Sequence, residues 1–384
     1  MAKFLEKLRS IGSKPHQPLP SGFYVYHTPE QEPDQFRLHL RVEPDGEGVL
    51  IVNASSILHL NQTATEFAYD LIQGKTEAQI IEMVAGRFDA APEIIAQDVA
   101  SFHQQLLNFV KKSDQEPIAN FGFEPTSNYQ DISAPYRLNC CLTYRTESLN
   151  ADLPEAAIFE ELDTDAWKSM IKKSFDAGIP HLVFYGGEPT LRDDLIPLLQ
   201  YCEELGLVTG LVSSGRKLTD EAYIESLLAS GLDHLLIPYD PEDTQLRAAL
   251  TKILPLDLYT CVGFSVNNTT EYPPLIDQLI ELGTNAFSLV PAGPESYGKY
   301  LEVAEYINNS NAALVGDLPL PAAQVELVKA RNHLKESLQE AEYVILEVKP
   351  DGEVYSSPVF GHRLGNLLEE NWQSIWDRRF QEQP

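Results

Sequence analysis

The stretch HLVFYGGEPTLRDDL (181–195) has the pattern of a buried strand, a glycine turn and the start of a helix. Gly186 and Gly187 have no side chain, so a ligand can come close to the backbone at this turn. Glu188 adds a carboxylate at the end of the strand, where it is suited to hold an ammonium group. Thr190 is also a good helix cap, which gives the turn a purely structural explanation beside the ligand-binding one.

Strands and helices alternate on both sides of this turn. Short apolar segments, each followed by an amphipathic helix, predict strands at 137–143, 181–185, 208–214, 234–239, 260–266 and 286–291. Strands that are apolar on both faces are typical of a parallel sheet, so the pattern predicts an α/β fold. The sheet is either a partial barrel or an open, doubly wound sheet. In both, ligands bind at the carboxyl ends of the strands.

The composition restricts the partners and the compartment. The chain has 57 Asp and Glu residues against 28 Lys and Arg, a formal charge of −29, and this anionic surface would repel nucleic acid. The first residues have no signal-peptide pattern, and no apolar run reaches the length of about 18 residues typical of a membrane span. One apolar helical face near the N-terminus (Phe4, Leu5, Leu8 and Ile11) indicates a docking helix or frayed end rather than a membrane-surface contact. We therefore expect a cytoplasmic protein without nucleic acid or membrane partners.

The N-terminal region has a different pattern. Alternating apolar residues predict short strands at 36–42, 49–52 and 57–60, and three amphipathic helices follow within residues 61–112. Such strands and helices together predict a small α+β module of winged-helix type. Residues 113–134 have no period and are rich in turn formers and acids, which indicates a linker.

The segments YGGEPTLRDDL (185–195) and LVSSGRKLTDEAYIESLLASGLDHLLIPYD (211–240) resemble the radical S-adenosyl-L-methionine (radical SAM) superfamily. The resemblance covers roughly residues 137–310 and implies a partial (β/α)6 barrel of the TIM type. In that family the Gly-Gly-Glu turn holds the amino group of SAM, and a later polar turn lies near the ribose. The implied SAM-type site consists of Gly186, Gly187, Glu188 and Ser214.

The cluster-binding motif of that family is missing from the matching loop. Cysteines in the order Cys-x3-Cys-x2-Cys normally ligate a [4Fe–4S] cluster, which chelates and cleaves SAM. Here the loop reads LTYRTESLNADLPEA (142–156), and the cysteine positions are occupied by Thr146, Asn150 and Leu153. None of these side chains replaces a thiolate on iron. We therefore expect no metal site and no [4Fe–4S] cluster, whereas SAM binding at a relict site stays open.

Residues 319–384 resemble the SPASM-type extension of peptide-modifying radical SAM enzymes. The segment VKPDGEVYSSPVFGHRLGNLLEENWQSIWDRRF (348–380) carries this resemblance. Family members have a cysteine after its first hairpin, where it binds an auxiliary cluster. This chain has Ser356 and Ser357 there, so the resemblance implies that metal ligands are lost at both sites.

Residues 36–112 resemble PqqD-like domains, the peptide-recognition modules that accompany radical SAM maturases. The segments ILHLNQTATEFAYDLIQGKTEAQIIEMVAGRF (57–88) and DVASFHQQLLNFV (98–110) carry the resemblance. In that family a leader peptide adds a strand beside the third strand and packs against the third helix. The implied peptide site consists of Ile57, Leu58, His59 and Leu60 on the strand and Val99, Phe102 and Leu106 on the helix. The alternative is that these are ordinary core residues of a small domain.

These resemblances divide the chain into an N-terminal tail (1–22), a PqqD-like winged-helix domain (23–112), a linker (113–134), a radical SAM-like partial barrel (135–318) and a SPASM-like extension (319–384). They favour a non-catalytic pseudoenzyme that acts as a peptide-binding scaffold, chaperone or regulatory partner of an active maturase or another assembly. One alternative is an enzyme, a SAM-using radical SAM maturase of peptides with unusual or borrowed cluster ligands. A second alternative is a purely structural, self-assembling subunit.

Overall fold

The structure is a computed structural model. It describes residues 19–29, 36–53, 56–87, 91–111, 118–121, 132–146, 161–241, 243–310, 312–315, 345–356 and 361–380. The chain divides into two compact units, one from residues 1–134 with 175–180 and the other from residues 135–174 with 181–384. Within these described ranges, no helix combines the length and the apolar character needed to cross a membrane.

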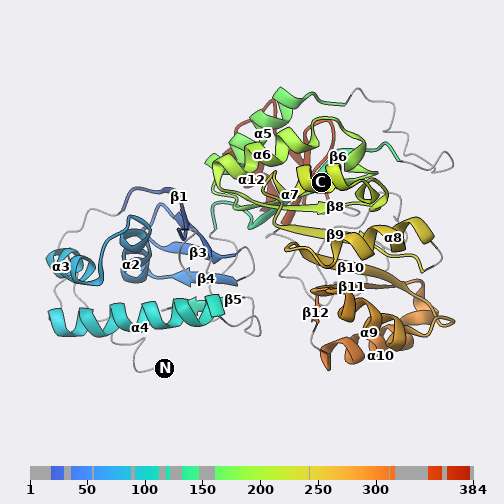
Figure 1. The fold of residues 1–384 in the computed structure, drawn as a ribbon. Coiled ribbons are helices and arrows are strands. Elements are labelled where there is room, and N and C mark those ends of the chain that lie inside the picture. The colour runs from blue at the N-terminus through green and yellow to red at the C-terminus, as the bar shows by residue number, and fades with distance from the viewer. Residues whose placement is uncertain are drawn as a thin grey trace. The chain divides into compact units, whose positions relative to one another are not determined.

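The first unit is built on a five-stranded sheet in the order β1-β2-β3-β4-β5 (Figure 1). The strands are β1 (Gly22–His27), β2 (Arg37–Val42), β3 (Gly48–Val52), β4 (Ser56–Leu60) and β5 (Ile118–Phe121). Neighbours from β1 to β4 run antiparallel, whereas β5 runs parallel to β4. The sequence pattern predicted only the strands at β2, β3 and β4. β5 lies inside the stretch assigned to a linker, 113–134.

Three helices complete this unit: α2 (Gln62–Ile72), α3 (Glu77–Arg87) and α4 (Pro92–Lys111). The side chain of Asn61 caps α2 by accepting a hydrogen bond from the amide of Ala64 at 2.9 Å. Alternate residues of the strands pack against buried side chains of the helices in one apolar core. The predicted small α+β module is therefore present, with two more strands than expected.

The second unit is built on a ten-stranded sheet in the order β12-β11-β10-β9-β8-β7-β6-β13-β14-β15. The parallel β/α strands are β6 (Arg137–Thr143), β7 (His181–Gly186), β8 (Val208–Val212), β9 (His234–Pro238), β10 (Tyr259–Val266), β11 (Ala286–Pro291) and β12 (Ala313–Leu314). The six predicted strands of the α/β region thus correspond to β6–β11, all parallel to their neighbours. Helices alternate with them: α5 (Thr164–Asp176), α6 (Leu195–Leu205), α7 (Glu221–Leu228), α8 (Thr244–Ile253), α9 (Tyr272–Leu282) and α10 (Tyr297–Asn308).

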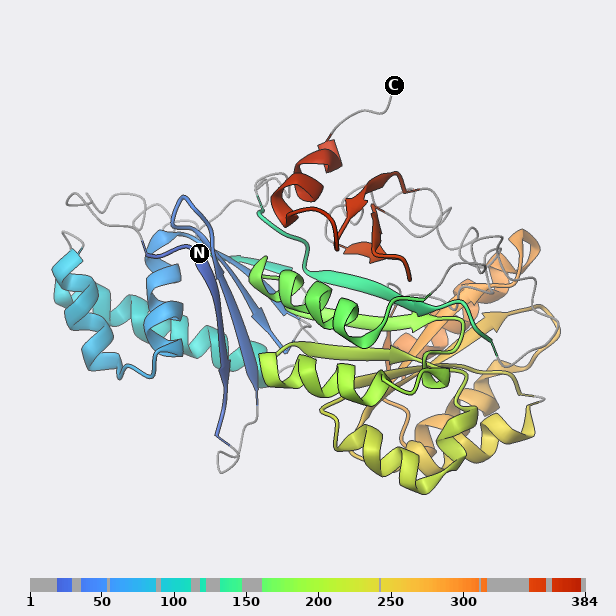
Figure 2. The ribbon, with the colours of Figure 1, turned by 90° about the horizontal axis from the view of Figure 1, so that it is seen from above.

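The C-terminal segments extend this sheet beyond β6 (Figure 2). β13 (Ile345–Val348) pairs parallel with β6, then β14 (Glu353–Tyr355) and β15 (Arg363–Asn366) pair antiparallel, before the short helix α12 (Trp372–Asp377). Ser356, at one of the positions implied for an auxiliary-cluster cysteine, instead shares a hydrogen bond of 3.2 Å with the Nδ1 atom of His362. The other position, Ser357, lies outside the described residues.

A row of apolar side chains crosses the parallel strands on one face of the sheet. Cys141 pairs with Tyr185 across β6 and β7, Val212 with Leu236 across β8 and β9, and Leu236 with Cys261 across β9 and β10. These residues form one buried cluster with Val183 and Ala286. Side chains of the chain itself therefore fill this face, from the second half of β6, β7 and β8 to the first half of β10 and β11.

Candidate functional site

The glycine turn after β7 is held against the end of β6. Gly186 has φ +141°, and a Cβ atom there would overlap the carbonyl oxygen of Thr143. A Cβ atom on Gly187 would overlap the carbonyl oxygen of Arg145 in the same way. The amides of Gly187 and Glu188 donate to those two carbonyls at 2.8 Å. Close approach of the chain's own backbone thus explains why both positions need glycine.

The carboxylate of Glu188 joins the ends of β7 and β8. It is only 2% exposed. Its Oε1 atom accepts hydrogen bonds from the amide and hydroxyl of Thr190, at 3.1 and 2.6 Å, and from the hydroxyl of Ser213 at 2.9 Å. Its Oε2 atom accepts from the amide of Ser214 at 2.6 Å. The structure thus brings together the predicted residues Gly186, Gly187, Glu188 and Ser214, and the carboxylate bonds to protein donors from both strand ends.

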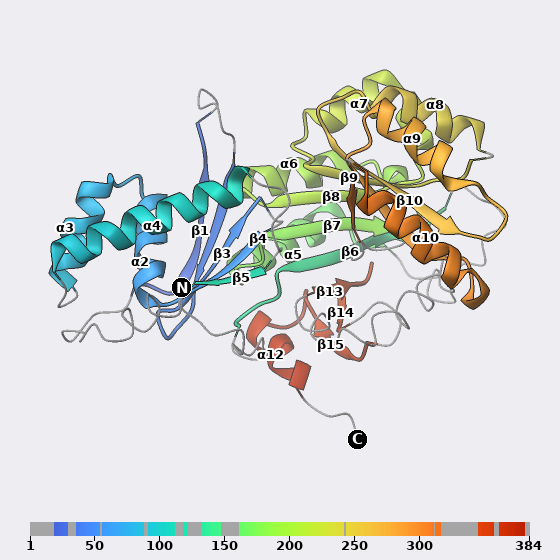
Figure 3. The ribbon, with the colours of Figure 1, turned by 90° about the horizontal axis from the view of Figure 1, so that it is seen from below.

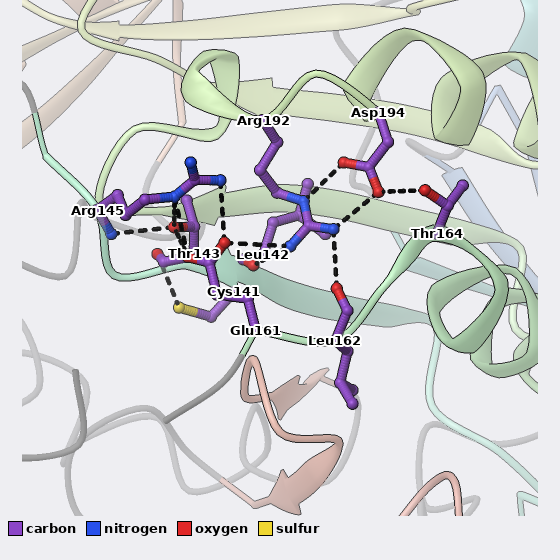
Figure 4. A network of polar contacts seen from close by, with 9 residues as sticks. All are labelled: Cys141, Leu142, Thr143, Arg145, Glu161, Leu162, Thr164, Arg192 and Asp194. Carbon is purple, nitrogen blue, oxygen red and sulfur yellow. Dashed lines mark hydrogen bonds and ion pairs between the residues drawn. The ribbon is translucent and has the colours of Figure 1, made fainter. Parts of the chain in front are cut away.

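A buried arginine beside the turn organises its other side (Figure 4). Arg192 is 6% exposed, and its guanidinium donates to both carboxylate oxygens of Asp194 at 2.8 Å. It also donates to the carbonyls of Leu142 at 3.2 Å and Leu162 at 2.9 Å. Burial by itself would raise the pKa of Asp194, but hydrogen bonds from Arg192 and Thr164 hold that pKa below its usual value. The guanidinium therefore connects β6, the segment before α5 and the segment before α6.

A second arginine extends this network toward solvent (Figure 4). Arg145, whose side chain is 54% exposed, forms an ion pair of 2.9 Å with Glu161. The hydroxyl of Thr143 donates to the same carboxylate. A depression of about 320 Å³ lies here, lined by Arg145, Glu161, Leu162, Asp163, Thr164, Arg192, Asp193 and Asp194. The sequence did not identify these residues as a site, because the contacts that join the segments, such as Arg192 with the carbonyl of Leu162, link positions far apart in the chain.

The residues of the cluster loop do not fit an iron–sulfur cluster. Thr146 is partly exposed just after this network, while Asn150 and Leu153 lie outside the described residues. These three side chains are a hydroxyl, an amide and a hydrocarbon, and a [4Fe–4S] cluster needs thiolates. In the part of the chain that the structure describes, no group of three or more His, Cys, Asp or Glu side chains could hold a metal ion.

The four cysteines lie elsewhere in the fold and have unsuitable surroundings. All are buried and free of disulfides: Cys140, Cys141, Cys202 and Cys261. Cys140 and Cys141 are neighbours on β6, so their side chains point to opposite faces of the sheet. Burial raises the pKa of both thiols and that of Cys202, which keeps them protonated near neutral pH. All four pack in the core of the second unit.

The predicted peptide-binding residues lie together in the first unit. Leu58 and Leu60 of β4 are buried with Val99, Phe102 and Leu106 of α4 in a single apolar core. Ile57 and His59 are partly exposed and, by strand alternation, point to the other face of the sheet. Burial, followed by the nearby charge of Arg41, lowers the pKa of His59 to about 4. The strand–helix arrangement expected for a peptide site is present, and its apolar residues also have a core role.

A family model for coenzyme PQQ synthesis protein D (PqqD) matches residues 47–108. The chain is 30% identical over 197 residues to a PqqA peptide cyclase of Methylorubrum populi, a match that covers 46% of this chain and 48% of that protein. It is 46% identical over 76 residues to the PqqA peptide cyclase of Rhizobium meliloti, covering 20% of each. These matches span about half, or less, of the length of the curated relatives.

Solved structures of SuiB from Streptococcus suis share the fold over most of the chain. SuiB bound to S-adenosylmethionine has a TM-score of 0.56 at 18% identity, and the match covers 92% of this chain and 88% of SuiB. SuiB bound to the precursor peptide SuiA has a TM-score of 0.54 at 17% identity, covering 88% and 86%. The predicted fold class is confirmed: residues 47–108 match the PqqD model, and the small N-terminal domain with its α/β sheet shares the fold of SuiB.

Proposed function

We propose that this protein is a non-catalytic radical SAM-like pseudoenzyme that binds a peptide through its PqqD-like domain. It would act as a scaffold, chaperone or regulatory partner for a peptide-modifying assembly. The observation that carries this proposal is the donor set of the cluster loop, in which Thr146, Asn150 and Leu153 replace three thiolates within a retained fold. Without thiolates, the electron needed for radical cleavage of SAM has no source in this chain.

The geometry of the glycine turn supports this proposal. The amides of Gly187 and Glu188 bond to the chain's own backbone, and the carboxylate of Glu188 accepts four hydrogen bonds from Thr190, Ser213 and Ser214. Each partner belongs to the protein, so the turn is stable without a ligand. In the proposed pseudoenzyme, this turn holds the ends of β6, β7 and β8 together and has no catalytic role.

The peptide-binding half of the proposal rests on the N-terminal unit. Residues 47–108 match the PqqD model, and SuiB, which has the same fold, is known in a complex with a precursor peptide. A peptide strand beside a sheet edge gains backbone hydrogen bonds, and nearby side-chain pockets select its register. β4 with α4 provides such a strand and such a helix, and the edge of β4 is open to a peptide only when β5 leaves it.

The resemblance to named cyclases favours one second candidate. The PqqA peptide cyclase of Methylorubrum populi is 30% identical over 197 residues, and SuiB has been solved with S-adenosylmethionine. An active maturase that borrows cluster ligands from a partner chain is compatible with both facts. It requires SAM to bind at Gly186, Gly187, Glu188 and Ser214.

A calorimetric titration of the purified full chain with SAM separates the two candidates. We expect no binding in the micromolar range, because without iron SAM loses the chelation of its amino and carboxylate groups. The matched variant Glu188→Gln should then give the same heat trace as the natural chain. Micromolar binding to the natural chain that weakens in Glu188→Gln would support the maturase and contradict the pseudoenzyme.

A further inference from the structure

A peptide strand is predicted to pair with the edge of β4, but another strand of this chain is already paired there. β5 pairs with β4 in parallel, in the register Ile57 to Ile118, Leu58 to Ala119, His59 to Asn120 and Leu60 to Phe121 (Figure 3). On its other side β4 pairs antiparallel with β3. Both edges of β4 are therefore occupied by segments of this chain.

β5 differs from the other strands of its sheet. It has four residues, it is parallel to its neighbour, and α2, α3 and α4 all lie between it and β4 along the chain. β3, by contrast, pairs with β4 over five positions and comes just before it in sequence. A short strand forms few ladder hydrogen bonds, and each contributes modestly to stability. Of the two neighbours of β4, β5 is the one that another strand can replace.

We propose that residues 118–121 are a built-in competitor for the peptide, so that a peptide strand binds β4 only after β5 has left that edge. This inference rests on the proposed peptide-binding function. A strand attached to the same chain competes at an effective concentration of about 1 mM. The apparent affinity for a free peptide then falls in proportion to the fraction of molecules with an open edge.

The negative charge of the chain would not repel a peptide that is uncharged, as β5 is. The sequence IANF (118–121) has no ionised side chain, and it follows Pro117. A proline cannot donate a ladder hydrogen bond, so it limits how far such a strand extends toward its N-terminal end. The competing partner is therefore a short, uncharged strand segment, and a peptide of residues 117–123 of this chain (PIANFGF), with both ends capped, is a defined probe for it.

The test compares the natural chain with two variants of full length. Ala119→Pro with Asn120→Pro removes two backbone donors from β5 and prevents regular strand pairing. Ala119→Gly with Asn120→Ala is the matched control, because it changes the same positions and keeps both amides. Hydrogen exchange at the amides of β4 reports whether β5 holds the edge. The amides of β2 do not face β5 and report that the sheet remains folded.

We expect amide exchange in β4 to rise roughly tenfold or more in the double-proline variant and to stay unchanged in the control. A fluorescent, end-capped peptide of residues 117–123 should bind the double-proline variant roughly tenfold more tightly than the natural chain. Unchanged exchange in β4 would overturn the inference, as would equal peptide affinity. It would also be overturned if β4 opened and the peptide failed to bind at about 1 mM. These readouts involve neither iron nor SAM. A failure here would overturn the competitor role of β5 and would leave the separate test of lost catalytic activity unaffected.

Discussion

Replacement of Arg192 by Met is expected to lower the free energy of unfolding by about 2–4 kcal/mol. The guanidinium is 6% exposed and bonds to Asp194 and to the carbonyls of Leu142 and Leu162. Met fills a similar volume but donates no hydrogen bond, so the buried carbonyl of Leu142 and the partly buried acceptors of Leu162 and Asp194 would lose this donor. Loss of one member of a buried ion pair is among the most destabilising single changes in a protein.

The matched control for this variant is Arg145→Met in the same network. Its side chain is 54% exposed, and its ion pair with Glu161 should contribute less than about 1 kcal/mol. Denaturant unfolding followed by tryptophan fluorescence suits the comparison, because all three tryptophans, Trp167, Trp372 and Trp376, belong to the second unit. Equal effects of the two variants would show that Arg192 does not organise the strand ends.

Replacement of Gly186 by Ala is expected to lower the stability of the second unit by about 2–4 kcal/mol. The backbone there has φ +141°, a conformation that side-chain-bearing residues rarely adopt. The added Cβ atom would overlap the carbonyl oxygen of Thr143 and lie 3.1 Å from the Sγ atom of Cys141. The end of β6 must therefore move away from the turn, which also disturbs the amide contacts of Gly187.

Gly298 is the control position for this second prediction. It lies at the start of α10, and a Cβ atom added there has no atom within 4 Å. Gly298→Ala should leave the stability unchanged or raise it by up to about 1 kcal/mol, because alanine favours helix. A Gly186→Ala protein that unfolds like the natural chain would contradict the explanation that packing against β6 requires glycine at this position.

The repeated strands of the second unit could be predicted because each is apolar on both faces and precedes an amphipathic helix. That pattern is local, and it placed all six strands from β6 to β11. β5 was missed for the opposite reason. It is a four-residue segment whose strand conformation depends on a partner distant in sequence, as the register of Ile118 with Ile57 illustrates. β1 was also missed, although it pairs with the next strand of the chain, because none of its residues is fully buried and the pattern of a half-buried strand is absent.

The same distinction applies to the site. Gly186, Gly187, Glu188 and Ser214 were placed together by the resemblance to the radical SAM superfamily, and the fold agrees because the glycine turn and the serine turn follow the neighbouring parallel strands β7 and β8. Arg192 stands in the same quoted stretch, yet nothing local marks it as buried. Its role depends on the carbonyls of Leu142 and Leu162, which only the folded chain brings within reach.

The claim that no cluster is bound has one direct test. Iron and sulfide are measured on the full chain after purification and reconstitution without oxygen, together with absorbance at about 400 nm, where iron–sulfur charge transfer absorbs. We predict background iron and no absorbance band, because Thr146, Asn150 and Leu153 supply no thiolate. About four irons per chain with the band would contradict the pseudoenzyme and require cluster ligands outside the usual loop.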